Sequence, residues 1–457
     1  MKKAKFDFDL IVIGTGAGGS AAAILAAKNG LRVAVVEKDL LGGESPNYGE
    51  IPNRAIFHTA KVFFEAQKAS KTGLRTSGLG FNFPALLSWR DLAIKRTGAH
   101  DNLDFYEKSG IKTIRGNARF INPHEITVNQ KHFSSKNFLI ATGTEFKIPN
   151  IINIKNVKFF TPKTIFETTR PPKSIFIIGG GSEAVEIAQI LAIFGTKVYL
   201  SEVSSRILPK EDEEIGIALE NAMIDEMKIA VLTNTRVVAV EADRMGKKVI
   251  FQRGGEEKFV RVDEILVADG RLANTDIGLE NANVEYDESG IIVDNLLQTS
   301  SKHIFASGAV ISGGASTTEA LIQSRVAAHN ILKPRQKISP EVEFSPRITN
   351  SFPEVASVGL SEDDCIKRDL RVKTAIAPLN LIARSNTENF SHGFVKLICD
   401  NKGRILGGSI VAPEASSLIG EIALAAKMGM NAHDLATLPH AFQSWSEAIR
   451  VCANRIR

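Results

Sequence analysis

The sequence predicts an α/β protein in which a strand–helix–strand unit occurs twice, followed by a smaller α+β domain. Three observations lead to this prediction. An apolar run, a glycine-rich turn, a helical stretch and a second apolar run ending at an acid occur in this order near the start of the chain and again near residue 175. The last third of the chain changes to short β-rich runs and then to helical periodicity. The length of 457 residues also allows for about three units of domain size.

Both copies of the repeated unit have the order and spacing of a nucleotide-binding strand–turn–helix. In the first, the apolar run Leu10–Ile13 precedes a cluster of glycines and a helical stretch, and Val33–Val36 ends at Glu37. In the second, Ile175–Ile178 precedes the glycines, and Glu202 stands at the end of the unit. The acid follows the first glycine by 23 positions in both copies. The sequence therefore predicts two dinucleotide-binding domains of the Rossmann type.

The glycines and acids of these units have separate expected roles. Gly14 permits the tight turn, Gly16 lets the backbone approach a pyrophosphate, and Gly19 permits close packing of the helix on the strand. The corresponding positions in the second copy are Gly179, Gly181 and Ala184. Glu37 and Glu202 are expected to accept hydrogen bonds from adenosine ribose hydroxyls. The alternative is that these glycines only allow tight turns to pack.

The acid of the second unit also bears on which pyridine nucleotide binds. The Glu202 carboxylate would repel a 2′-phosphate, which favours NAD(H) over NADP(H). Arg206 follows four positions later and weakens this preference, because a guanidinium can bind a phosphate.

The remaining segments complete the predicted domains. The apolar strands within 137–143 and 265–271 each end in a glycine-containing turn and are expected to close the two units. Segment 333–336 is polar, contains a proline and is a candidate linker. Residues 344–411 alternate β-rich runs with turns, and a helical pattern begins at Ala415. The apolar positions of that helix are Leu418, Ile419, Ile422, Ala423 and Met428.

Composition and charge argue against several other classes of function. The net charge of +5 is spread over the chain without a dense basic block, so neither nucleic acid nor a membrane surface is an expected partner. We also expect no membrane span and no signal peptide, because the N-terminal apolar run is interrupted by acids and followed by glycines. Cys365, Cys399 and Cys452 have no metal-like spacing and are expected to be reduced thiols of a cytoplasmic protein without a metal site.

Several segments resemble the pyridine nucleotide-disulphide oxidoreductases over nearly the whole chain. The segment from Gly42 reads GGESPNYGEIPNRA and resembles the active-site segment of that family. Further similar segments are IATGT from Ile140, VADGRLANTDIGLE from Val267, FASGAV from Phe305 and PEVASVGLSE from Pro353. The resemblance implies an FAD-binding domain in two parts, residues 1–146 and 273–336. It also implies an inserted NAD(P)-binding domain at 147–272 and a C-terminal α+β domain at 337–457 that forms the homodimer.

The resemblance adds further positions to the predicted cofactor sites. FAD is expected at the first glycine turn and NAD(H) at the second. The additional cofactor-binding positions are Gly42, Gly43, Thr142, Gly143, Gly270, Gly308 and Ala309. The family has an aspartate at the position of Ala309, where it binds the ribityl chain of FAD. Loss of one such charged hydrogen bond costs about 1.5–3 kcal/mol, so we expect FAD to be held weakly.

The active-site segment departs from the family at both redox cysteines. The two cysteine positions, separated by four residues, are occupied by Ser45 and Glu50. Neither side chain can form a disulphide or a flavin adduct, because that chemistry requires a thiolate. If ionised and near the flavin, Glu50 would oppose its reduction; the alternative is a solvated or ion-paired carboxylate.

Two further motifs are altered relative to the family. LPHAFQSWSEAIR resembles the acid–base motif that is donated across the dimer; Glu447 is present, but Phe442 replaces the histidine and His440 lies two positions earlier. The family's lysine near the flavin is Arg54 here, and its glutamate partner matches Glu186. Arg54 and Glu186 would either order the nicotinamide or form a structural ion pair.

The sequence supports one leading hypothesis about function and two alternatives. The first is an FAD-dependent NAD(P)H oxidoreductase that passes electrons directly to a small non-thiol acceptor such as a quinone, with Arg54, Glu186, Glu447 and Glu50 as the candidate catalytic residues. The second is a catalytically degenerate, dimeric nucleotide-binding protein. A disulphide reductase resembling dihydrolipoamide dehydrogenase is the third.

Overall fold

The computed structural model describes residues 5–390 and 392–456, which form two compact units. Unit 1 consists of the described parts of Met1–Ala55, Ser88–Lys147 and Arg271–Val342. Unit 2 consists of those of Ile56–Leu87, Ile148–Gly270 and Glu343–Arg457. Two long helices, α3 (Glu50–Lys68) and α4 (Phe83–Thr97), contribute residues to both units. The predicted four-part division of the chain remains a prediction, because unit 2 contains both the second glycine turn and the C-terminal residues.

The sheet of unit 1 is parallel at its centre and antiparallel at one side. Its strands run in the order β3-β2-β1-β6-β5-β4, and β18 pairs in parallel with β6. The strands are β1 (Phe8–Ile13), β2 (Val33–Glu37), β3 (Lys112–Arg115), β4 (Ala118–Asn122), β5 (Glu125–Val128), β6 (Lys131–Ile140) and β18 (Ile304–Ala306). Short pairs are formed by β7 (Thr144–Phe146) with β15 (Arg271–Ala273) and by β16 (Tyr286–Asp287) with β17 (Gly290–Ile291).

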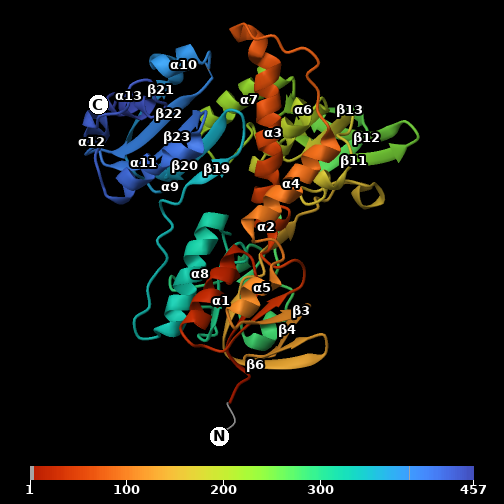
Figure 1. Cartoon of the computed structure of the whole chain (residues 1–457), viewed down its shortest axis with the longest axis vertical. Helices are drawn as coiled ribbons and strands as arrows, with labels where there is room; N and C mark the ends of the chain where they lie inside the picture. Colours follow the sequence, from red (N-terminus) through yellow and green to blue (C-terminus); the bar gives the residue numbers. More distant parts are fainter. Residues whose placement is uncertain (1–4, 391, 457) are drawn as a thin grey trace. The chain divides into compact units, whose positions relative to one another are not determined.

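The apolar runs of the sequence form the centre of this sheet. Leu10–Ile13 lies in register with Val33–Val36 on one side and with 137–140 on the other. All four residues of the central run are at most 4% exposed, as expected for a strand covered on both faces. Helix α1 (Ala17–Lys28) packs beside α8 (Thr317–Leu332), where the amide of Ala22 donates to Ser324 Oγ at 2.9 Å (Figure 1). The other helices of this unit are α2 (Glu44–Asn47), α5 (Leu103–Lys108) and the 3₁₀ turn Leu279–Ala282.

The second glycine turn lies in a smaller parallel sheet of unit 2. Its order is β10-β9-β8-β14, formed by β8 (Ser174–Ile178), β9 (Lys197–Ser201), β10 (Ala230–Leu232) and β14 (Glu264–Val267). Helices α6 (Ser182–Ile193) and α7 (Glu213–Met227) belong to the same region. An antiparallel meander completes it with β11 (Thr235–Asp243), β12 (Gly246–Arg253) and β13 (Glu256–Val262). The 3₁₀ turns of this part of unit 2 are Ala69–Thr72, Ile154–Asn156 and Ile165–Glu167.

The C-terminal part of unit 2 is an antiparallel sheet with helices. The strand order is β19-β20-β23-β22-β21. The strands are β19 (Arg347–Thr349), β20 (Glu354–Gly359), β21 (Val372–Pro378), β22 (Phe394–Asp400) and β23 (Ile405–Ala412). The helical elements are α9 (Glu362–Lys367), the 3₁₀ turn Leu379–Leu381, α10 (Ala383–Thr387), α11 (Ala415–Lys427), α12 (Ala432–Thr437) and α13 (Glu447–Ala453).

The predicted fold class is confirmed: the chain has two parallel α/β sheets with glycine turns and a terminal α+β domain. One expectation within that domain is wrong. Helix α11 buries Ile419 and Ile422 as the periodicity predicts, but Met428 follows the last helical turn and is 68% exposed. Among the described residues, no helix is both long and apolar enough to cross a bilayer.

Candidate functional site

The first glycine turn has backbone geometry that a side chain would block. Gly14 has a φ of +98°, and a Cβ there would lie 2.2 Å from the Ala141 carbonyl oxygen. A Cβ on Gly19 would lie 2.1 Å from the carbonyl oxygen of Gly14, so helix α1 packs directly against the turn. Gly16 is different, because a Cβ there would meet only the Cα of Gly43, at 3.8 Å. The turn therefore has no room for a side chain at Gly14 and Gly19, whereas the space beside Gly16 is open.

Glu37 is connected to this turn through a residue that the sequence analysis did not identify. Its Oε2 accepts hydrogen bonds from the amide of Thr15 at 2.9 Å and from the Thr15 hydroxyl at 2.7 Å, and its Oε1 accepts from the amide of Asp39 at 3.0 Å. Thr15 Oγ1 also accepts from the amide of Gly42 at 3.1 Å. A carboxylate has about four acceptor positions, so Glu37 can accept one more hydrogen bond from a ribose hydroxyl. Burial raises the pKa of the nearby Tyr106 phenol to about 12, so this group stays neutral.

The second glycine turn reproduces the main contact of the first. Gly179 has a φ of +112°, and its Cβ would lie 2.3 Å from the Ala268 carbonyl oxygen at the end of the closing strand. A Cβ on Gly181 would meet nothing within 4 Å. Ala184, at the third position, is 1% exposed and forms part of the core. The two turns therefore share one construction: the first glycine touches the carbonyl oxygen that follows the closing strand.

Glu202 lies at the end of β9 and retains acceptor capacity. The residue is 7% exposed; its Oε2 accepts from the amide of Gly180 and its Oε1 from the amide of Ser204, both at 2.8 Å. Each oxygen can still accept a hydrogen bond from a ribose hydroxyl. Arg206 Nη2 donates to Asp363 Oδ2 and to the Glu211 carbonyl, each at 3.3 Å.

The residues at both turns fit a dinucleotide. Gly16 and Gly181 are the N-cap residues of helices α1 and α6, and a glycine has no side chain that could accept from the first amides of its helix. Free amides and the helix dipole at such ends suit a pyrophosphate, and the two glycines leave room for its approach. Gly143 and Gly270 also have positive φ and open space where a Cβ would stand. Thr142 Oγ1 donates to the Asn274 carbonyl at 2.8 Å, which holds the end of β6 in place.

The position predicted to hold the ribityl chain is only partly suited to FAD. Gly308 has a φ of +84° and lies against Gly18, with its amide donating to Gln323 Oε1 at 2.8 Å. Ala309 is half-buried and presents a methyl group in place of a carboxylate. The backbone is therefore held in place here without a side-chain acceptor at Ala309.

The active-site segment lies in unit 1, directly after β2. Gly42 and Gly43 both have positive φ, and a Cβ on Gly43 would lie 2.6 Å from the Cα of Gly16. The segment therefore touches the first glycine turn. Ser45 is half-buried in α2, and Glu50 is exposed at the start of α3, where it accepts a short hydrogen bond from the Thr317 hydroxyl.

A bidentate ion pair holds the start of α2. Both Nη atoms of Arg271 donate to the carboxylate of Glu44, and the guanidinium stacks 4.4 Å from the ring centroid of Phe146. Arg271 Nη1 also donates to Thr144 Oγ1 at 3.2 Å. Two short strands and the active-site segment are thereby connected through one arginine.

All three cysteines lie in the C-terminal part of unit 2 and are buried. Burial raises the pKa of the Cys399 and Cys452 thiols to about 12 and also raises that of Cys365. These thiols are therefore protonated at neutral pH and unreactive.

The C-terminal motif is ordered by local contacts. The His440 side chain is 3% exposed; its Nε2 bonds Glu421 Oε1 at 2.8 Å and its Nδ1 bonds the Leu438 carbonyl at 2.9 Å. This geometry favours a structural role for His440. Glu447 Oε2 accepts from the amide of Gln443 at 3.2 Å, while Phe442 is 78% exposed.

Arg54 and Glu186 lie in different compact units, and their predicted pairing remains a prediction. Arg54 is exposed on α3. Glu186 is 9% exposed on α6, and its Oε1 accepts from the amide of Asn350 at 2.7 Å. Glu186 therefore links α6 to the start of the C-terminal domain.

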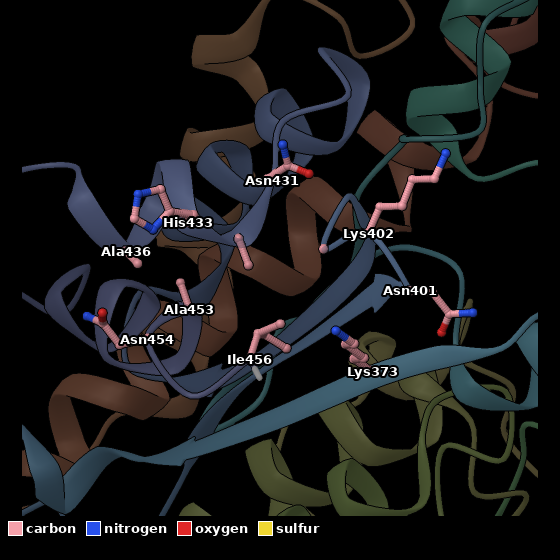
Figure 2. Close-up of a pocket in the computed structure, with 11 residues that line it drawn as sticks. Lys373, Asn401, Lys402, Asn431, His433, Ala436, Ala453, Asn454 and Ile456 are labelled. Atoms are coloured by element: carbon pink, nitrogen blue, oxygen red, sulfur yellow. The ribbon is translucent and has the colours of Figure 1, made fainter.

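One cavity in unit 2 contains neither glycine turn. It has a volume of about 260 Å³ and lies in the C-terminal domain between Lys373, Asn431 and Ile456 (Figure 2). Lys402 points away from Lys373, so the basic groups at its edge do not converge on a ligand (Figure 2). Within residues 5–390 and 392–456, no group of three histidine, cysteine, aspartate or glutamate side chains is placed to hold a metal ion.

Several contacts of the site were not predicted from the sequence. They are Thr15 with Glu37, Arg271 with Glu44, Thr317 with Glu50 and Asp363 with Arg206. Only the first joins residues of one strand–helix–strand unit. No spacing or periodicity indicates the others, because their partners are 157 to 267 positions apart.

Comparison with known proteins gives a consistent result over the whole chain. The family described as pyridine nucleotide-disulphide oxidoreductase matches residues 8–329, and its dimerisation domain matches residues 345–453. Dihydrolipoyl dehydrogenase from Thermus scotoductus is 34% identical, with 98% of this chain and 97% of that protein covered. Mercuric reductase from Staphylococcus aureus is 30% identical, with 98% of this chain and 82% of that protein covered.

A solved structure shows the same fold. The HOCl-induced flavoprotein disulfide reductase RclA from Escherichia coli superposes with a TM-score of 0.86 at 24% identity. The superposition covers 98% of this chain and 100% of that protein.

Proposed function

Because the chain belongs to the pyridine nucleotide-disulphide oxidoreductase family, whose members are FAD-dependent oxidoreductases that use NAD(P)H, we propose that it passes electrons from NADH to a small non-thiol acceptor such as a quinone. The absence of a usable thiol carries this proposal. Ser45 and Glu50 occupy the positions of the redox cysteines, and the three thiols of the chain are buried with raised pKa values.

Each nucleotide turn has a distinct role in this proposal. FAD bound at the first turn would supply two-electron redox chemistry, which protein side chains cannot provide. Gly16 leaves room for the pyrophosphate, and Glu37 accepts from the adenosine ribose. Gly181 and Glu202 do the same for NADH at the second turn. We expect weak FAD binding, because Ala309 provides no acceptor for a ribityl hydroxyl.

Four charged residues have proposed roles at the reacting end. Arg54 and Glu186 would order the nicotinamide, and an ionised Glu50 near the flavin would oppose its reduction. Glu447 stabilises the loop that presents Phe442, through its hydrogen bond to the amide of Gln443. The family's dimerisation domain matches residues 345–453 of this chain, which supports a homodimer.

The proposal is tested with the purified full-length protein loaded with FAD under anaerobic conditions. NADH should bleach the yellow colour, and a quinone such as menadione should restore it over repeated cycles. Alkylation of accessible thiols under native conditions should leave quinone turnover unchanged, while lipoamide and oxidised glutathione should not be reduced. Rapid turnover of either disulphide would refute the proposal. A protein that takes up FAD but is not bleached by NADH would instead support a nucleotide-binding protein without turnover.

A further inference from the structure

We propose that Asp363 sets the preference for NAD(H) over NADP(H) by holding Arg206 away from the ribose end of the nucleotide. The inference rests on the proposed function in one respect, because it takes the Gly179 turn as the pyridine nucleotide site. Asp363 comes from the C-terminal domain and Arg206 from the nucleotide domain, and both lie in unit 2. Asp363 would act as a positioning residue, since it touches Arg206 and not the nucleotide.

Arg206 is the first cation after the acid that is proposed to bind the ribose. It follows Glu202 by four positions in the loop between β9 and α7. An arginine in this neighbourhood can accommodate a 2′-phosphate, whereas an acid alone repels it. Selectivity therefore depends on where the Arg206 guanidinium points.

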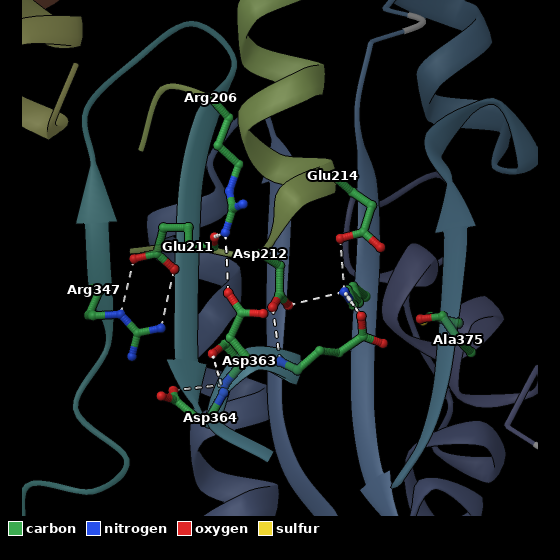
Figure 3. Close-up of polar contacts among 12 residues, drawn as sticks. Arg206, Glu211, Asp212, Glu214, Arg347, Asp363, Asp364 and Ala375 are labelled. Carbon is green, nitrogen blue, oxygen red and sulfur yellow. Dashed lines mark hydrogen bonds and ion pairs between the residues drawn. The ribbon is translucent and has the colours of Figure 1, made fainter. Parts of the chain in front are cut away.

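In the structure the guanidinium donates to one acceptor in the C-terminal domain and to one in its own domain. Nη2 donates to Asp363 Oδ2 and to the Glu211 carbonyl oxygen, each at 3.3 Å (Figure 3). The aliphatic part packs on Gly216, where a built Cβ would lie 3.3 Å from the Cβ of Arg206. Figure 3 shows Arg206 extended towards Asp363 with a dashed line joining them.

This attachment is weak enough for one acid to control it. Among the described residues, the buried Arg206 Nε has no hydrogen-bond partner. Within that part of the chain, the guanidinium makes two hydrogen bonds, and Nη2 donates both of them. The two side chains are 22% and 59% exposed. A partly exposed ion pair of this kind contributes little energy, so neutralising the acid should release the guanidinium at small cost.

Among the contacts of the described residues, Asp363 pairs with Arg206, whereas its two acidic neighbours have other partners. Glu362 pairs with Lys396 at 3.1 Å, and Asp364 forms the capping box of α9 with Ser361. Substitution of either neighbour would disturb a structural contact. Asp363→Asn therefore changes the partner of Arg206 while leaving the cap of α9 and the Lys396 contacts in place.

The test measures binding of adenosine 2′,5′-bisphosphate and of 5′-AMP to the full-length protein by titration calorimetry. In Asp363→Asn, the ratio of the two dissociation constants should shift about twofold to fivefold in favour of the bisphosphate. The double variant Asp363→Asn/Arg206→Gln should lose this shift. Asp276→Asn is the matched control, because Asp276 forms a similar exposed ion pair with Arg119 at 3.2 Å in unit 1.

The outcomes separate this inference from the proposed function. An unchanged ratio in Asp363→Asn would overturn the inference, as would a shift that persists without Arg206 or that also appears in Asp276→Asn. If the shift occurs but NADH does not bleach the FAD-loaded protein, the proposed function fails and the inference stands. If neither nucleotide binds to any variant, the Gly179 turn is not the nucleotide site and the inference fails.

Discussion

Replacement of Lys396 by methionine should destabilise unit 2 by about 3 kcal/mol. Lys396 lies on β22 with a fully buried side chain. Its Nζ is 2.9 Å from Glu214 and 3.1 Å from both Asp212 and Glu362. Asp212 directly precedes α7, Glu214 lies in its first turn, and Glu362 is the first residue of α9. One lysine therefore ties the nucleotide domain to the C-terminal domain.

The magnitude follows from how buried each acid is. Asp212 is 3% exposed, whereas Glu214 and Glu362 are 38% and 37% exposed. Removing one partner of a buried ion pair costs about 3–5 kcal/mol, because the other charge is left uncompensated. Only Asp212 is left in that state, and it keeps a hydrogen bond from the amide of Glu362 at 2.9 Å. The lower end of the range is therefore expected, and Glu214→Gln should cost less than about 1 kcal/mol.

The loss should also depend on pH, with a sign that follows from Asp212. Burial alone would lower the pKa of Lys396, but its carboxylate partners raise it, so the lysine is cationic. Burial raises the pKa of Asp212, and Lys396 partly offsets this effect. In Lys396→Met the pKa of Asp212 in the folded protein would lie further above its unfolded value. The variant should therefore regain stability as the pH falls, and lose it as the pH rises through the folded pKa.

The assay is urea unfolding of both variants and the unsubstituted protein at pH 7 and pH 5, followed by tryptophan fluorescence. Trp445 is 3% exposed in the C-terminal domain and reports on unit 2. The difference between Lys396→Met and the unsubstituted protein should be large at pH 7 and smaller at pH 5. A loss no greater than that of Glu214→Gln, or a difference that widens on acidification, would refute the reasoning.

Three further predictions concern the flavin site. Gly43→Ala should destabilise unit 1 by more than about 2 kcal/mol and abolish FAD binding in a fluorescence titration. The φ of +69° and ψ of −152° at Gly43 suit only glycine, and an added Cβ would lie 2.6 Å from the Cα of Gly16. Gly30→Ala, at a φ of +84° with open space, is the control and should retain FAD binding. Ala309→Asp should tighten FAD binding about tenfold to hundredfold. An unchanged affinity would show that position 309 does not bind the ribityl chain. Glu50→Gln should raise the flavin reduction potential by on the order of 10 mV in a spectroelectrochemical titration, and a lowered potential would place the carboxylate elsewhere.

The sequence by itself predicted the two glycine turns and showed that the segment from Gly42 contains no cysteine pair. Each turn is local: a buried strand, a glycine at positive φ and an acid at the end of the next strand lie within one strand–helix–strand unit. Short-range backbone geometry is what sequence spacing encodes, so Gly14 and Gly179 were identified without coordinates. The identities of Ser45 and Glu50 exclude disulphide chemistry at that segment in any conformation.

Only the tertiary structure decided which charged groups meet. Arg206 was expected to weaken the preference for NAD(H), but folding brings it to Asp363, 157 positions later. Lys396 meets Glu214, 182 positions away, and Glu50 meets Thr317, 267 positions away. Long-range ion pairs and hydrogen bonds have no periodicity in the sequence, because their geometry depends on how separate sheets and helices pack. Spacing therefore identified the two glycine turns, and packing determined which charged groups meet around them.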